Sequence, residues 1–361
     1  MSADVLTIRR VRACPVAVRL PRPVRTAVGT IPAAPLVLID VATEQGVTGR
    51  SYLFGYNAPS LMGPLARLVE EIGAELKGEA VAPAARMRQL NRRFRLIGWQ
   101  GLVGMAVSGL DMAFWDVLGH AAGLPVVRLL GGTPTPVRAY DSYGVVDPRA
   151  DEPDLARSLE AGFKGIKIKL GDGDLARDVE TVRAVRQIVG PDVALMVDYN
   201  QSLDVAEACQ RVARLREFDL AWVEEPVAAE DLLGHARVRA AVDVPVQTGE
   251  NWWFPRDMQK ALAAGACDLA MPDLGKIGGI TGWLGAMGQG EAASVPVSSH
   301  IYVEASAHVL PVTPTAHWLE HLDFAGGVLQ EPVQVVDGML TARGPGLKLA
   351  WDEAAVARYA V

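Results

Sequence analysis

The order of apolar and polar positions divides the first third of the chain into two stretches. Residues 1–55 carry strand-type patterns, with an apolar run at residues 36–41. Apolar positions then change to helical spacing, which predicts helices at 61–76, 81–94 and 104–119. The sequence GGTPTP at residues 131–136 is typical of a domain boundary. We therefore expect an α+β domain over residues 1–130.

Beyond residue 136, short apolar runs alternate with amphipathic stretches long enough for one helix each. Such alternation predicts parallel strands with crossover helices, and eight units close into a barrel. An open doubly wound sheet is the alternative, but the regular spacing favours an α/β fold with a (β/α)8-type barrel over residues 131–322. The eight runs are residues 137–143, 165–170, 193–198, 221–225, 244–249, 269–272, 295–299 and 317–319.

Composition limits the class of partner. The chain has 35 basic and 42 acidic residues, a net charge of −7, so we expect neither nucleic acid nor a membrane as partner. Half of the residues are hydrophobic, which excludes disorder over most of the length. The three scattered cysteines form no disulfide framework, and the N-terminus lacks the apolar core of a signal peptide. A cytoplasmic location is expected.

Three acidic residues end three successive predicted strands. Asp198, Glu224 and Glu250 are spaced 26 residues apart, which is one strand–helix period, so they should project toward one point. Crowded carboxylates repel one another unless a cation lies between them. Oxygen ligands suit a hard divalent ion, and we predict Mg²⁺, with Mn²⁺ as the alternative.

Other ionisable residues occupy further strand ends. Lys167 and Lys169 are two apart on a strand and share a face, which suits a ligand for a substrate carboxylate and a base. Asp273 and His300 end neighbouring strands, where a carboxylate can fix the imidazole tautomer. Glu320 ends the eighth strand. It could be a surface charge, a metal ligand or a proton donor, and we favour a hydrogen-bond donor.

This set of groups permits two reactions. A lysine base on one side of a metal and a His–Asp base on the other can remove a proton from one face of a carbon and return it on the opposite face. That is racemisation or epimerisation. The same groups can remove an α-proton and expel a β-hydroxyl group, which is dehydration.

Several segments carry a family signature. They are MVDYNQSLDV (196–205), VPVQTGENW (244–252), KIGGITGW (276–283) and TPTAHWLE (313–320), with further matches at 26–30, 34–40 and 51–54. Over nearly its whole length, the chain resembles the mandelate racemase subgroup of the enolase superfamily. The resemblance implies that residues 1–130 form a capping domain, whose lid loop at about 22–31 covers the barrel mouth. Residues 323–361 would return to that cap. It also implies a homo-oligomer, commonly an octamer.

The resemblance implies a role for each site residue. Asp198, Glu224 and Glu250 would bind Mg²⁺, Lys169 would act on the (S) enantiomer, and His300 with Asp273 on the (R) enantiomer. Lys167 would neutralise the substrate carboxylate, and Glu320 would donate a hydrogen bond to it. Asn200 would contact the α-hydroxyl region, and Ser142 would lie near the carboxylate.

The implied reaction is racemisation of mandelate or a close aryl or vinyl 2-hydroxy acid, within mandelate catabolism. Val24, Val28 and Ile31 make the lid apolar, and Tyr56 and Leu322 could complete an apolar pocket. Packing in the core of the capping domain is the alternative for the apolar lid residues. Arg22, Arg25, Tyr143 and residues 301–302 depart from the family pattern and leave the best substrate open. The charged Arg22 and Arg25 are the only hint of an acid-sugar dehydratase. A non-catalytic barrel is the remaining alternative, and it would predict the loss of a ligand or base.

Overall fold

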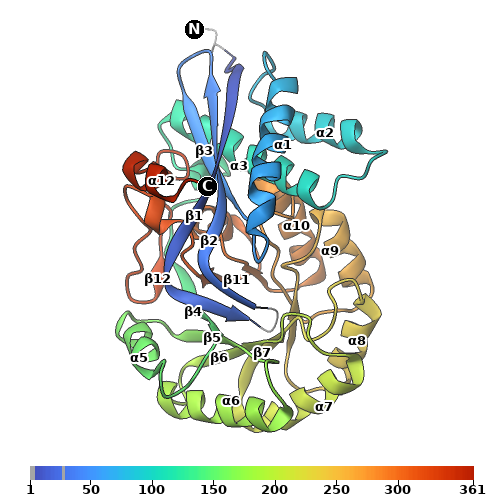
Figure 1. The fold of residues 1–361 in the computed structure, drawn as a ribbon. Coiled ribbons are helices and arrows are strands. Elements are labelled where there is room, and N and C mark those ends of the chain that lie inside the picture. Colours follow the sequence, from blue (N-terminus) through green and yellow to red (C-terminus); the bar gives the residue numbers. More distant parts are fainter. Residues whose placement is uncertain (1–4, 27–28) are drawn as a thin grey trace.

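The computed structural model describes residues 5–26 and 29–361 and divides them into a cap and a barrel (Figure 1). The cap begins with an antiparallel sheet of β1 (Ile8–Thr26), β2 (Gly29–Thr43) and β3 (Thr48–Phe54). Three longer helices follow: α1 (Met62–Glu75), α2 (Pro83–Phe94) and α3 (Leu102–Ala122). Helices α1 and α3 pack on this sheet, and α2 packs against α3. The three predicted helices are therefore present, with boundaries shifted by a few residues.

The barrel consists of eight parallel strands whose spatial order is their order in the chain. Pairing of the last strand with the first closes the sheet, so the predicted barrel fold is confirmed. The strands are β4 (Val137–Val145), β5 (Gly165–Lys169), β6 (Ala194–Asp198), β7 (Leu220–Glu224), β8 (Val246–Thr248), β9 (Leu269–Ala270), β10 (Val297–Ser299) and β11 (Ala316–His321).

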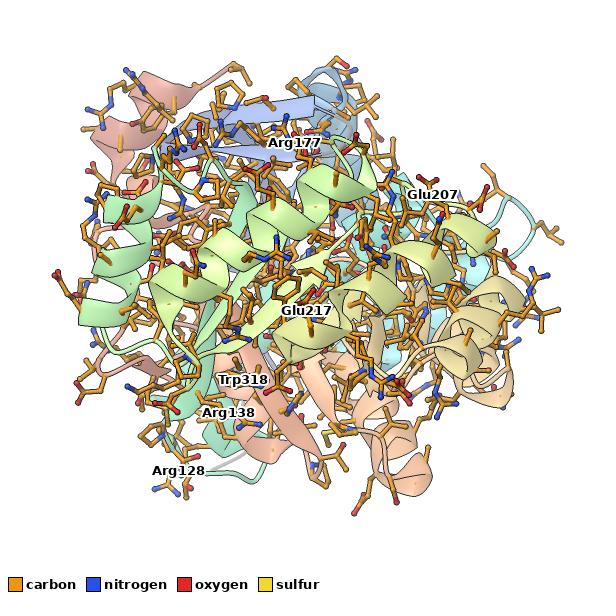
Figure 2. All side chains as sticks on the ribbon, turned by 90° about the horizontal axis from the view of Figure 1, so that it is seen from below. Arg128, Arg138, Arg177, Glu207, Glu217 and Trp318 are labelled. Carbon is orange, nitrogen blue, oxygen red and sulfur yellow. The ribbon has the colours of Figure 1, made fainter. Side chains whose placement is uncertain are left out.

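Helices connect the strands on the outside of the barrel. They are α5 (Glu152–Glu160), α6 (Leu175–Val189), α7 (Val205–Leu215), α8 (Leu232–Ala241), α9 (Phe254–Ala263), α10 (Gly279–Ala293) and α11 (Val303–Val309). Figure 2 shows α6 and α7 side by side on this outer layer. The α6 boundary follows the sequence, because the Asp174 carboxylate accepts a hydrogen bond from the Arg177 N–H and caps the helix.

The interior of the barrel is filled by side chains that alternate inward along each strand. Tyr140, Met196, Trp222 and Trp318 form one buried aromatic and sulfur layer. Gly165 leaves the space that this layer needs, since a Cβ atom there would lie 2.9 Å from the Tyr140 Cβ. The Arg138 guanidinium lies 4.2 Å from the Trp318 ring centroid, and the two are adjacent in Figure 2. Polar residues two positions further along these strands consequently surround the opposite end.

The last elements of the chain contact both the barrel and the cap. The short strand β12 (Met339–Leu340) pairs antiparallel with β4, and α12 (Glu353–Tyr359) lies against β1 (Figure 1). Helix α3 is apolar and long enough to cross a bilayer, but 78% of its most apolar window is buried inside the protein. It contacts β3, α1 and α10, which is the environment of a core helix.

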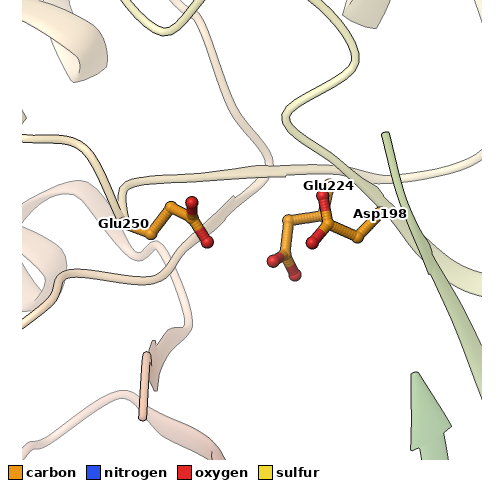
Figure 3. Close-up of side chains that lie close together, drawn as sticks. All are labelled: Asp198, Glu224 and Glu250. Atoms are coloured by element: carbon orange, nitrogen blue, oxygen red, sulfur yellow. The ribbon is translucent and has the colours of Figure 1, made fainter. Parts of the chain in front are cut away.

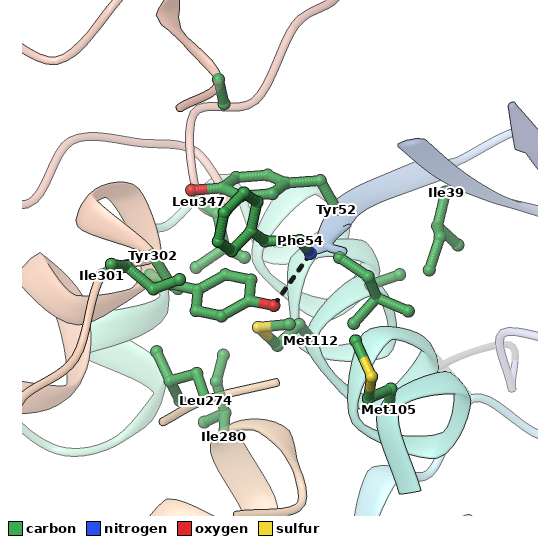
Figure 4. Close-up of a cluster of buried hydrophobic side chains, with 14 of the residues drawn as sticks. Ile39, Tyr52, Phe54, Met105, Met112, Leu274, Ile280, Ile301, Tyr302 and Leu347 are labelled. Atoms are coloured by element: carbon green, nitrogen blue, oxygen red, sulfur yellow. Dashed lines mark hydrogen bonds between the residues drawn. The ribbon is translucent and has the colours of Figure 1, made fainter. Parts of the chain in front are cut away.

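An aromatic contact joins the cap to the barrel (Figure 4). The rings of Tyr52 on β3 and Tyr302 after β10 stack with centroids 5.2 Å apart. The Phe54 N–H donates a hydrogen bond of 3.2 Å to the Tyr302 hydroxyl. Ile301 and Tyr302, which depart from the family pattern, have positive φ values of 37° and 48°. These values turn the chain back toward the cap. The Tyr302 side chain therefore seats β3 on the barrel.

The described residues of the predicted lid form two paired strand ends, which are called the hairpin below. β1 continues to Thr26 and β2 begins at Gly29, with Val24 paired to Ile31 across the two strands. The register shifts between Arg19 and Val24, where the hairpin leaves the cap sheet. Val28 lies outside the described residues. Since β-ladder hydrogen bonds hold both sides, the apolar residues have fixed directions.

Candidate functional site

Three carboxylates meet at the end of the barrel, as their spacing predicts. Asp198 ends β6, Glu224 ends β7, and Glu250 follows β8. Each offers one oxygen, and these oxygens all lie within 4.8 Å of one another. Figure 3 shows Glu250 pointing from one side, and Asp198 and Glu224 from the other, toward a common space. Three buried carboxylate oxygens at this separation fit a hard divalent cation; the assignment of these residues as its ligands stays a prediction.

Neighbouring side chains hold two of these carboxylates in place. The Asn200 backbone N–H and side-chain amide donate to Asp198 at 2.7 and 3.0 Å. Trp222 and Gln247 each donate to Glu224 Oε2 at 3.1 Å. Burial raises the pKa of Glu224 to about 7, and Lys167 opposes this shift. The donors favour the charged form and fix the direction of each oxygen.

The two predicted lysines point into this cluster. Lys169 forms an ion pair with Asp198. Lys167 Nζ lies 2.5 Å from Glu224 Oε1 and 2.8 Å from Glu320 Oε1. Burial lowers the pKa of both lysines, but the carboxylates outweigh it, so the pKa of Lys167 rises well above its usual value and that of Lys169 also rises.

His300 and Asp273 form the expected pair. The His300 Nδ1 lies 2.5 Å from Asp273 Oδ2, and its Nε2 lies 3.1 Å from Glu250 Oε2. The Tyr56 hydroxyl also donates to Asp273 Oδ2, at 3.1 Å. Burial lowers the pKa of His300, but Glu250, Glu320 and Asp273 raise it to about 10. Because Nδ1 is bound to Asp273, Nε2 is the nitrogen that faces the triad.

Lys169 and His300 approach the triad from different sides of the barrel. Lys169 lies on β5 and pairs with Asp198, whereas His300 follows β10 and contacts Glu250. Two strands, β4 and β11, separate β5 from β10 along the shorter path around the barrel. This arrangement provides a basic group on each side of a ligand placed at the triad.

Glu320 is a buried residue beside Lys167 and outside the triad. It accepts a hydrogen bond of 3.1 Å from the Ile301 N–H, and its Oε2 lies 3.7 Å from His300 Nε2. Burial raises its pKa, but Lys167 and His300 lower it to about 2. Glu320 is therefore ionised and accepts hydrogen bonds in this arrangement.

Among the buried polar atoms without a hydrogen-bond partner in the described part of the chain, two belong to residues predicted to contact the substrate. They are Ser142 Oγ and Asn200 Oδ1. Ser142 pairs with Lys167 in the β4–β5 register, so the two side chains share the inner face. An unpaired buried polar atom is costly, and a polar ligand would satisfy both atoms.

The residues predicted to contact the apolar end of the substrate lie in the hairpin, after β3 and after β11. Val24 and Ile31 are buried, and the Tyr56 ring is parallel to the His300 imidazole, with centroids 6.5 Å apart. Leu322 lines a separate hollow beside Arg22. The contact of these four residues with substrate stays a prediction.

Two charged residues of the hairpin that depart from the family pattern, Arg22 and Arg25, bind the barrel. Arg22 donates to the Ser142 carbonyl oxygen, and its guanidinium lies 3.5 Å from the Tyr143 ring centroid. Arg25 donates to the Val145 carbonyl oxygen at 2.9 Å and forms an ion pair with Asp151. Both arginines therefore fasten the hairpin to β4 and the segment after it.

A polar group next to the triad is not among the site residues predicted from the sequence. Lys276, Asn251 and Glu225 are hydrogen-bonded in a row, and Asn251 also donates to Glu250 at 3.2 Å. Alternation along a strand would point Glu225 away from Glu224. Its φ of 33° turns the chain, and its carboxylate lies against Asn251. The available signal was the position of all three residues in the segments that follow barrel strands, with Glu225 directly after β7.

Comparison with known families covers most of the chain. Residues 8–131 match the N-terminal domain of the mandelate racemase/muconate lactonizing enzyme family, and residues 152–355 match the family described as enolase C-terminal domain-like. A crystal structure of an enolase from Bradyrhizobium complexed with magnesium and mandelic acid is 59% identical. It superposes with a TM-score of 0.97 over 99% of both chains.

Curated relatives catalyse several reactions. L-talarate/galactarate dehydratase of Salmonella typhimurium is 33% identical over 68% of this chain, a match that spans 62% of the dehydratase. D-galactarolactone cycloisomerase of Agrobacterium fabrum is 31% identical over 90% of both chains. These matches extend over cap and barrel alike, and the chain belongs to the mandelate racemase/muconate lactonizing enzyme family of the enolase superfamily.

Proposed function

We propose that this protein is a Mg²⁺-dependent racemase of mandelate or of a close aryl or vinyl 2-hydroxy acid. The observation that carries the proposal is the approach of Lys169 and His300 to the acidic triad from different sides. A base on one face of the α-carbon removes the proton, and the group on the other face returns one, which inverts the centre. Only the pair of groups together permits inversion.

Each base presents one defined atom. Asp273 holds the His300 Nδ1, so Nε2 exchanges the proton, and Lys169 uses Nζ. The charges of Asp198 and Glu250 raise the two pKa values, so neutralising those charges brings both bases toward the working range. A divalent cation held by the triad supplies positive charge that stabilises the substrate carboxylate as the α-proton leaves.

The remaining polar groups would hold the substrate. Lys167 pairs with its carboxylate, and the unpaired Ser142 Oγ and Asn200 Oδ1 offer hydrogen bonds to the carboxylate and the α-hydroxyl. Glu320 can donate only when it is protonated. A substrate carboxylate that competes for Lys167 removes the strongest charge lowering the Glu320 pKa, which favours that proton.

The cap supports an aryl or vinyl substrate over a polyol. The Val24 and Ile31 side chains are apolar, and the Tyr56 ring lies beside His300. Arg22 and Arg25, the only hint of a sugar acid, are bound to the barrel. The similarity to the Bradyrhizobium enolase, crystallised with mandelic acid, points in the same direction.

An acid-sugar dehydratase is the second candidate, because the dehydratase of Salmonella typhimurium is among the curated relatives. The same bases would remove the α-proton and expel a β-hydroxyl group. A non-catalytic barrel is disfavoured, since every predicted ligand and base is present. On the resemblance alone, we also propose a cytoplasmic homo-oligomer, with an octamer as its form.

Polarimetry with (R)-mandelate and Mg²⁺, repeated in D₂O with proton NMR, tests the reaction. Decay of the rotation to zero with deuterium at the α-position is expected. Persistence of both the rotation and the α-proton would exclude mandelate. A sugar-acid library scored for 2-keto products then tests the dehydratase.

A further inference from the structure

Lys276 is a buried cation at the margin of the site, in the turn between β9 and α10. Its side chain makes two contacts with uncharged groups. Nζ donates a hydrogen bond of 2.7 Å to Asn251 Oδ1 and lies 4.1 Å from the Tyr56 ring centroid. Lys276 is 6% exposed, so water replaces neither contact fully. An ammonium held this way bridges the barrel and the cap.

The contact with Asn251 acts on the acidic triad. Because Lys276 holds the amide oxygen, the amide nitrogen must face the other way. There it donates to Glu225 Oε2 at 2.7 Å and to Glu250 Oε1 at 3.2 Å. Lys276 therefore fixes the orientation of an amide that, in turn, orients Glu250.

The contact with Tyr56 acts on the pair formed by His300 and Asp273. Tyr56 lies in the cap turn after β3 and has a φ of 52°. Its hydroxyl donates to Asp273 Oδ2, the same oxygen that binds His300 Nδ1. A cation against the face of this ring holds the turn in place over Asp273.

We infer that Lys276 is a positioning residue that couples seating of the cap turn to cation binding at the triad. This inference rests on the proposed function, which assigns Glu250 as a metal ligand. Loss of the ammonium frees Asn251 to rotate and Tyr56 to leave Asp273. Cation binding at the triad and the placement of the cap turn over Asp273 should then weaken together.

The test compares Lys276→Met, which keeps side-chain length but removes the charge, with Lys276→Arg, which keeps a donor and a charge. Calorimetric titration with Mg²⁺ and Mn²⁺ alone should give a dissociation constant about 10- to 100-fold weaker for the Met variant, the usual effect of losing such a support. Hydrogen exchange at residues 55–58 should become faster. Lys276→Arg should keep most of the wild-type metal affinity and most of the wild-type protection from exchange. Lys260→Met, in an exposed position on α9, should change neither.

Unchanged metal affinity in Lys276→Met overturns the inference, and so does weaker metal binding without faster exchange at 55–58. Neither measurement uses turnover, so they decide the matter even if mandelate is not a substrate. Should Lys276→Met fail to fold, Tyr56→Leu tests the link from the cap. Weaker metal binding by at least about threefold supports coupling, and unchanged binding overturns it.

Discussion

The Arg22 guanidinium carbon lies over the Tyr143 ring, 3.5 Å from its centroid, and joins the hairpin of the cap to the first strand of the barrel. Its Nη2 also donates to the Ser142 carbonyl oxygen at 3.1 Å. Gly144 permits the hairpin to approach β4 at Arg25, because a Cβ atom at position 144 would lie 2.4 Å from the Arg25 backbone. The hairpin is thus fastened directly beside Ser142, a residue of the site.

Arg22→Ala should loosen the hairpin and raise KM more than it lowers kcat. A cation–π contact is worth roughly 0.5–2 kcal/mol, so a rise in KM of about 2- to 30-fold is expected. Steady-state kinetics with the best 2-hydroxy acid would measure it. Arg9→Ala, an exposed arginine on the same strand, is the control. Equal effects of the two substitutions would argue against the fastening.

Removing one base should abolish racemisation but leave proton exchange with one enantiomer. Lys169→Ala should retain α-deuteration of (R)-mandelate, and His300→Asn that of (S)-mandelate. Racemisation should fall by at least about 10²- to 10⁴-fold, the usual contribution of general base catalysis. Proton NMR in D₂O separates exchange from inversion. Inversion that survives in either variant would contradict a two-base mechanism.

Chelation should remove activity, and Mg²⁺ or Mn²⁺ should restore it. Binding to the folded state alone also raises stability, by about 2.7 kcal/mol at 100 times the dissociation constant. Thermal melts with increasing Mg²⁺ should therefore shift upward for the wild type and little for Glu250→Gln. Glu291→Gln, on the exposed surface of α10, should shift as the wild type does. A shift retained by Glu250→Gln would place the cation elsewhere.

A buried carboxyl group between cap and barrel should make stability depend on pH. Burial raises the pKa of Asp111 to about 7, against a hydrogen bond from the Thr281 N–H. The folded state then keeps a proton that the unfolded state loses, so its contribution to stability falls as pH rises from about 4 to 7.

Asp111→Asn removes this titration with little change of shape. Its free energy of unfolding relative to the wild type should rise between pH 4 and 7 and level off above 7, by on the order of a few kcal/mol. Urea denaturation across that range measures the difference. A difference that does not change with pH would rule out the titration of Asp111 as its source.

The sequence alone determines the barrel and the convergence of the triad. The carboxyl ends of all strands in a parallel barrel lie at the same end of the barrel. A spacing of one strand–helix period is therefore enough to bring Asp198, Glu224 and Glu250 together. The period of two along a strand likewise places Lys167 and Lys169 on one face. Both patterns are regular repeats along the chain, so they can be predicted from the sequence without the tertiary structure.

Only the tertiary structure decides how the cap closes on that end. Arg22 meets Ser142 across 120 residues, and Tyr56 meets Asp273 across 217. Lys276 joins the cap to the triad through the Asn251 amide and the Tyr56 ring, and both partners are distant from it in the sequence. Such contacts depend on the relative position of two domains and on backbone turns at single residues. No local periodicity encodes them, because they arise only when the packed cap brings distant side chains face to face.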